Sequence, residues 1–180
     1  MKNYLLLFLA FIALSISAFK PLSDDNKKKD KEPEGIKWMT IQQAEAKSKK
    51  NPKKIFIDVY TDWCGWCKKM DKNTFSDPKI AEYVNKNYYA VKLDAETKED
   101  IVLNGKTYKY NTANKVNDLA VELLQGKMGY PCTVYLDEKF NMLAPVMGYL
   151  EVKPFDNLIR YYGDNKYKTQ SFEEFEASRK

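Results

Sequence analysis

The chain has 180 residues, of which 44% are hydrophobic and 31% are charged. This length and composition suit one domain with a single buried core and argue against two full domains. Lys and Arg (30) outnumber Asp and Glu (25), which leaves a formal net charge of +5, and much of that excess lies in the charged stretch 26–31. A charge excess located in such a segment gives no reason to predict nucleic-acid binding.

The N-terminus has the pattern of a secretory signal peptide. Lys2 precedes an apolar run from Tyr4 to Ile16, and small residues follow that run. A membrane-spanning helix usually needs about 20 apolar residues, so an uncleaved membrane anchor is the weaker alternative. We expect a signal peptide over residues 1–18, cleaved near Ser17 or Ala18, and a mature protein that is periplasmic or secreted and does not span the membrane.

A charged segment over residues 19–35 follows the signal peptide and contains almost no large apolar residues. Such a segment cannot bury enough surface to order itself, so we interpret it as a linker. The globular pattern covers residues 36–163, and a tail of residues 164–180 follows it. Ser171 and Glu174 in this tail have the capping-box spacing of a short helix.

Strand and helix patterns alternate along the globular region. The run Lys54–Tyr60 is apolar and β-branched, as is typical of a central strand covered on both faces. The alternation predicts an α/β fold in which a mixed sheet is covered by helices. In chain order we expect a short strand at 36–38, a helix over 40–48, a strand at 54–60, a helix from 64, a helix from 78 to 87, a strand at 88–94, a helix over 114–125, an antiparallel strand pair at 133–137 and 143–148, and a helix ending at 163.

Two cysteines, Cys64 and Cys67, frame a Cys-Gly-Trp-Cys motif at the predicted start of a helix. Free N–H groups and the dipole at a helix N-terminus favour a thiolate, which is the nucleophile in disulfide exchange, so Cys64 is the candidate attacking group. Cys67 lies on the same face of the first turn and can resolve a mixed disulfide. Asp58, on the buried strand before the motif, is the candidate base for the resolving thiol.

Other readings of these residues stay open. The pair could be a structural disulfide, and Asp58 could be a hydrogen-bonded buried carboxylate, but a helix-start pair at this spacing favours a redox centre. Three cysteines and no histidine are too few for a typical zinc site, so we expect no metal and no other cofactor. The competing function is a binding protein, such as a copper carrier with Cys132 as a third thiolate ligand. Cys132 could otherwise be a small buried residue or a partner for an active-site cysteine under oxidation.

Residues 36–163 resemble the thioredoxin-like superfamily. As in that family, an aspartate (Asp58) lies six residues before the first cysteine of the pair and a tryptophan (Trp63) directly precedes that cysteine. Lys92 resembles the family's strand-borne lysine, which tunes the pKa of the buried aspartate. The resemblance implies a thioredoxin fold, a central mixed β-sheet flanked by helices.

The stretch GYPCTVYL, residues 129–136, resembles the family's proline-containing segment that leads into a strand. The resemblance implies that the Tyr130–Pro131 bond is cis, that it lies against the two cysteines, and that the segment presents backbone groups to a bound peptide. The expected substrate contacts are Trp63, Gly65, Trp66, Tyr130 and Pro131.

A closer likeness is to the C-terminal thioredoxin-like domain of the transmembrane reductase DsbD. It rests on NTFSDPKI after the cysteines and on MGYLEVKPF near the end of the chain. It implies a reducing role toward protein thiols and disulfides, with a membrane electron-donor protein as a candidate partner. Gly65 and Trp66 provide no histidine cation between the cysteines, which also favours a reductase over an oxidant.

Residues 95–113 make the chain longer than a minimal thioredoxin. Asn104 and Gly105 lie between strand-forming residues, which predicts a β-hairpin inserted before the third core helix. We hypothesise that Tyr108 and Tyr110 form a wall beside the substrate. The alternative is that the hairpin only decorates the sheet.

Overall fold

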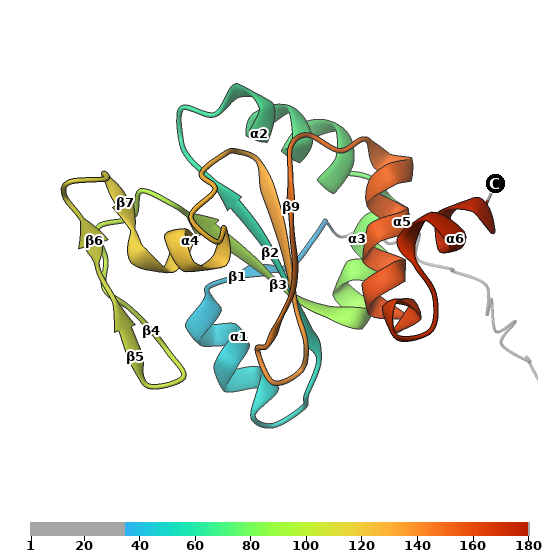
Figure 1. Cartoon of the computed structure of the whole chain (residues 1–180), viewed down its shortest axis with the longest axis horizontal. Coiled ribbons are helices and arrows are strands. Elements are labelled where there is room, and N and C mark those ends of the chain that lie inside the picture. Colours follow the sequence, from blue (N-terminus) through green and yellow to red (C-terminus); the bar gives the residue numbers. More distant parts are fainter. Residues whose placement is uncertain (1–34, 180) are drawn as a thin grey trace, which may run out of the picture. The chain divides into compact units, whose positions relative to one another are not determined.

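The computed structural model describes residues 35–179, so the predicted signal peptide and nearly all of the predicted linker lie outside the described residues. Figure 1 shows a central sheet with helices on both sides. The elements in chain order are β1 (Trp38–Met39), α1 (Ile41–Ser48), β2 (Lys54–Tyr60), α2 (Gly65–Met70), the π-helical turn η1 (Asp71–Phe75), α3 (Pro78–Asn87), β3 (Tyr88–Asp94), β4 (Ile101–Leu103), β5 (Lys106–Tyr108), β6 (Tyr110–Asn111), β7 (Val116–Asn117), α4 (Asp118–Leu123), β8 (Cys132–Leu136), β9 (Met142–Met147), α5 (Val152–Gly163), the 3₁₀ turn η2 (Lys166–Lys168) and α6 (Phe172–Ala177).

The five-stranded sheet has the order β1-β3-β2-β8-β9. β3 pairs in parallel with both β1 and β2, whereas β8 is antiparallel to β2 and β9 is antiparallel to β8. The two outer strands are β1, which has only two residues, and β9, in which Pro145 lies opposite Val134. This mixed sheet with flanking helices confirms the predicted fold class.

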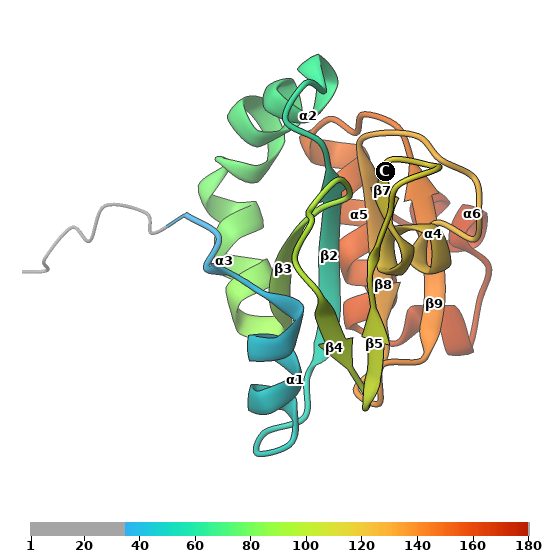
Figure 2. The same cartoon turned by 90° about the vertical axis from the view of Figure 1, so that its left-hand side faces the viewer.

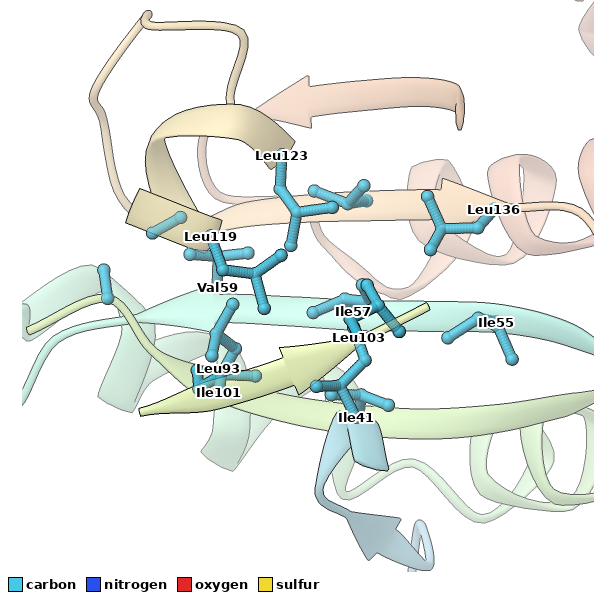
Figure 3. Packing of buried hydrophobic residues seen from close by; sticks show 14 of the residues in the cluster. Ile41, Ile55, Ile57, Val59, Leu93, Ile101, Leu103, Leu119, Leu123 and Leu136 are labelled. Carbon is cyan, nitrogen blue, oxygen red and sulfur yellow. The ribbon is translucent and has the colours of Figure 1, made fainter. Parts of the chain in front are cut away.

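The core consists of two layers, one on each face of the sheet, because side chains alternate along β2. Ile55, Ile57 and Val59 lie in the cluster shared with α1, α4 and the hairpin β4–β5, and Figure 3 shows these side chains meeting. Phe56 points to the other face, where α3 and α5 cover it (Figure 2). Full burial of such a side chain contributes about 1.5–3 kcal/mol, so the strand that carries the site is firmly held.

Helix starts follow the polar residues that the sequence places there. Thr40 and Gln43 form a capping box at the start of α1, and Ser171 and Glu174 form the capping box expected at the start of α6. Asp77 accepts hydrogen bonds at the start of α3, and Pro78 is the first residue of that helix. Each cap satisfies N–H groups that have no partner within the helix.

The predicted helix over residues 114–125 is wrong at its start, since α4 begins only at Asp118. The side chain of Asn117 accepts a hydrogen bond from the N–H of Leu119 at 3.0 Å and caps the helix there. The preceding residues form β7, which pairs with β6. Asn side chains favour caps over helix interiors, which accounts for the late start.

The predicted hairpin region contains the antiparallel pair β4–β5, with Asn104 and Gly105 at the turn. Both have positive φ, which these two residue types tolerate. Tyr108 is buried, and its hydroxyl donates a hydrogen bond to Glu122 of α4 at 2.8 Å. Tyr108 therefore belongs to the core, whereas Tyr110 in β6 is half-buried, and the hypothesis that these two tyrosines form a wall beside the substrate stays a prediction.

Candidate active site

The cysteine pair lies at the carboxyl end of β2, where the chain turns into α2 (Figure 1). Cys64 and Cys67 form a disulfide, and both are buried. Cys64 is the N-cap of α2, and its Sγ accepts a hydrogen bond from the N–H of Cys67 at 3.0 Å. The same N–H would stabilise a thiolate on Cys64 once the bond is reduced.

Asp58 lies on β2, six residues before Cys64, and only 1% of its surface is exposed. It is opposite Lys92 in the parallel pairing of β2 with β3, and its Oδ2 is 3.4 Å from the Lys92 Nζ. Its Oδ1 has no hydrogen-bond partner among the described residues. Burial raises the pKa of Asp58 to about 7, and Lys92 opposes that rise only in part. A carboxyl group with this pKa can both take up and release a proton near neutral pH.

Lys92 connects Asp58 to a second carboxylate, Asp71. The Lys92 Nζ forms a closer ion pair with Asp71 than with Asp58, and the negative charge of Asp71 adds to the rise in the pKa of Asp58. Aromatic rings surround this ammonium group, with centroids 5.1, 5.3 and 5.9 Å from the Nζ, and they belong to Trp38, Tyr60 and Phe75.

Asp71 was missed at the sequence level. It begins the π-helical turn that continues α2, and it follows Cys67 by four residues, which is about one helical turn. A carboxylate one turn after the resolving cysteine is the signal that could have identified it, because such residues share a helix face.

Trp63 and Tyr130 lie together on one side of the disulfide. Trp63 is 66% exposed, and its ring contacts the Tyr130 ring with centroids 5.9 Å apart. The Trp63 Nε1 also donates a hydrogen bond to Glu96 at 2.9 Å, a partner that the sequence did not indicate. The Tyr130–Pro131 bond is cis, as the resemblance implied. Gly65 is exposed, with open space where a Cβ would lie.

A second aromatic pair involves Trp66, which is 56% exposed although it lies between the cysteines. Its ring centroid is 5.4 Å from that of Tyr149, in the loop between β9 and α5. The Lys69 Nζ lies over both rings. Tyr149 is part of the stretch MGYLEVKPF, but nothing in the local pattern connected it with the cysteines. Of the predicted substrate contacts, Trp63 and Tyr130 therefore form one aromatic pair, and Trp66 forms a second pair with Tyr149.

Cys132 is a free, buried thiol opposite Val59 in the pairing of β8 with β2. Burial raises its pKa to about 11, so it is a neutral thiol at physiological pH. Residues 35–179 contain no group of three His, Cys, Asp or Glu side chains arranged to hold a metal ion. The geometry therefore lends no support to Cys132 as a third copper ligand.

Sequence comparisons relate the chain to one family model and to part of several longer proteins. The family model Thioredox_DsbH, described as "Protein of unknown function, DUF255", matches residues 26–156. Thiol:disulfide interchange protein DsbD from Vibrio vulnificus is 28% identical over 117 residues, which are 64% of this chain and 17% of that protein. The chain spans less than a fifth of the length of the curated relatives that it matches.

Structural comparisons identify the same fold. A thioredoxin from Thermus thermophilus superimposes with a TM-score of 0.55 at 14% identity, covering 72% of this chain and 88% of that one. A structure described as DsbH oxidoreductase superimposes with a TM-score of 0.53 at 16% identity, covering 73% of this chain and 86% of that one. At these identities, the likeness establishes the thioredoxin fold.

Proposed function

The chain belongs to the Thioredox_DsbH family and has the thioredoxin fold, and we propose that it is an exported thiol-disulfide oxidoreductase that reduces disulfides of other proteins. One observation carries the proposal. The Cys64–Cys67 disulfide begins a helix, and six residues before Cys64, on β2, lies a buried carboxyl group, Asp58, whose pKa is about 7. A nucleophile, a resolving thiol and a proton acceptor are the groups that disulfide exchange requires.

In the reduced protein, the Cys64 thiolate attacks one sulfur of a client disulfide. A bond forms between Cys64 Sγ and that sulfur, the client S–S bond breaks, and the second client sulfur leaves as a thiolate that takes a proton from water. Cys67 then passes its proton to Asp58 and attacks Cys64 Sγ. The Cys64–Cys67 disulfide forms, the mixed disulfide breaks, and the first client sulfur leaves as a thiolate that takes a proton from water, while Asp58 returns its proton to the solvent. Two electrons have moved from the cysteine pair to the client.

A cycle of this kind needs an external dithiol to reduce the Cys64–Cys67 disulfide again. A membrane protein that passes electrons outward is the donor that we propose, because the chain is similar to part of DsbD. The signal-peptide pattern of residues 1–18 supports export to the periplasm or beyond. Within residues 35–179, no helix is long and apolar enough to cross a membrane.

The reduction potential of the cysteine pair tests the direction of electron flow. The protein is equilibrated with a series of dithiothreitol or glutathione buffers, and the oxidised fraction is read by alkylation and mass. A potential near that of thioredoxin, about −270 mV, is expected for a reductase. A potential near that of DsbA, about −120 mV, would mean that the protein oxidises its clients instead.

Cysteine variants test the assigned roles. Cys64→Ser should abolish reduction of a protein disulfide, and Cys67→Ser should accumulate a mixed disulfide that gel electrophoresis without reductant detects. Cys132→Ser is the matched control, since the buried thiol takes no part in the proposed cycle. A mixed disulfide formed by Cys67 in the Cys64→Ser variant would reverse the assignment.

A further inference from the structure

Three side chains beside the disulfide form a small surface that the proposed cycle does not use. We call it the Trp66 surface, and it consists of Trp66, Lys69 and Tyr149. The Lys69 Nζ lies 4.6 Å from the Trp66 ring centroid and 5.1 Å from the Tyr149 ring centroid. The Tyr149 hydroxyl also accepts a weak hydrogen bond from the Asn73 amide at 3.5 Å. Contacts from α2, η1 and the loop after β9 thus hold the rings and the ammonium group in place.

The ammonium group of Lys69 has no carboxylate partner within residues 35–179. Lys92 and Lys106 also lie over aromatic rings, but each of them forms an ion pair as well. Contact with a ring attracts a cation without neutralising it, so Lys69 keeps its full charge. It lies on the exposed face of α2, where a carboxylate from another molecule can reach it.

Because this surface lies beside the reactive cysteine, only the part of a client close to the attacked disulfide can bind there. Trp66 follows Cys64 by two residues in the first turn of α2. An extended chain advances about 3.3 Å per residue, so residues one to three positions from a client cysteine can reach the surface while that cysteine reacts. The surface can therefore contact the side chains immediately beside the client disulfide and distinguish between them.

We propose that the Trp66 surface selects protein disulfides that have an acidic side chain within three residues of the attacked cysteine. The client carboxylate pairs with the Lys69 ammonium group, and an apolar side chain of the client packs on the exposed Trp66 and Tyr149 rings. This inference rests on the proposed function, because the surface can select a client only if Cys64 exchanges with that client.

Two disulfide peptides that differ only in Glu or Gln two residues from the cysteine test the selection. The full protein is kept reduced with dithiothreitol, and kcat/KM is measured for each peptide. An exposed ion pair favours the Glu peptide by about twofold to fivefold, and about 0.5 M salt should reduce that ratio. Lys69→Met should bring the ratio to about one.

Lys68→Met is the matched control, because it removes the same charge from the preceding residue of α2, which contacts no aromatic ring within residues 35–179. The ratio should persist in that variant. Lys69→Glu should reverse the preference toward a peptide with Lys at the same position, which a merely structural role of Lys69 would not do. Equal rates for the Glu and Gln peptides would overturn the proposed preference for acidic clients and leave the proposed function standing. Failure to reduce either peptide would overturn both the preference and the proposed function.

Discussion

Asp58→Asn is expected to stabilise the oxidised protein increasingly as the pH rises. Folding buries Asp58 and raises the pKa of its carboxyl group from 3.8 to about 7. The folded state therefore favours the protonated acid, so the contribution of Asp58 to stability is present at low pH and is lost as the pH rises through about 7. Asparagine resembles the protonated acid in shape and carries no charge at any pH.

The size of the effect follows from the two pKa values of Asp58. Above about pH 4 the carboxyl group is ionised in the unfolded chain, whereas in the folded protein it keeps its proton up to about pH 7. Between about pH 5 and pH 7 the folded state holds one more proton, and each pH unit lowers stability by about 1.4 kcal/mol. The advantage of the variant should therefore grow by about 3 kcal/mol between pH 5 and pH 9.

Urea unfolding of the oxidised wild type and variant at a series of pH values measures this difference. The oxidised form is used because Cys64 and Cys67 do not titrate in a disulfide. Cys132 is present in both proteins, so its ionisation cancels. A difference in the free energy of unfolding that is the same at both ends of the pH range would refute the argument that burial of Asp58 dominates its pKa.

Three further predictions concern other parts of the domain. Asp71→Asn should lower the pKa of Asp58, because a negative charge is lost and Lys92 is left with one carboxylate partner. NMR titration of the Asp58 carboxyl carbon measures this pKa, and an unchanged or raised value would contradict the prediction. Cys132 should resist iodoacetamide in the folded protein and react after unfolding, and rapid labelling of the native form by mass would contradict this. Phe155→Ala should destabilise the protein by about 3–5 kcal/mol in urea unfolding, and a loss below about 1 kcal/mol would contradict the packing.

The central strands could be predicted because their signals are local. Lys54–Tyr60 and Tyr88–Asp94 are runs of apolar and β-branched residues, and the structure has strands with these same bounds. The predicted start of α4 is too early because Val116 lies at helical spacing from Leu119 and Ala120, whereas the helix begins after the cap at Asn117. Helical periodicity shows which residues could share a face, and a cap determines where the helix begins.

The residues of the candidate site were also predictable only where a local sequence signal places them. The positions of Asp58 and Cys64 follow from a strand, a turn and a helix start, which are contiguous in sequence. Asp71, Glu96 and Tyr149 reach the site through tertiary contacts made by the π-helical turn and by two loops. An exposed polar or aromatic residue has no local signal that specifies its partner, so these contacts could not be predicted from the sequence.

The two edge strands of the five-stranded sheet, β1 and β9, offer few unpaired backbone groups with which another chain could pair. β1 pairs over only two residues, and Pro145 in β9 lacks the N–H that a further strand would need. A client tethered through a mixed disulfide places unfolded, extended chain at high local concentration beside the protein. At the two edge strands of this sheet, the client chain therefore finds no long row of unpaired backbone N–H and C=O groups with which to pair. This lowers the tendency of the protein to aggregate with the unfolded chains that it would reduce.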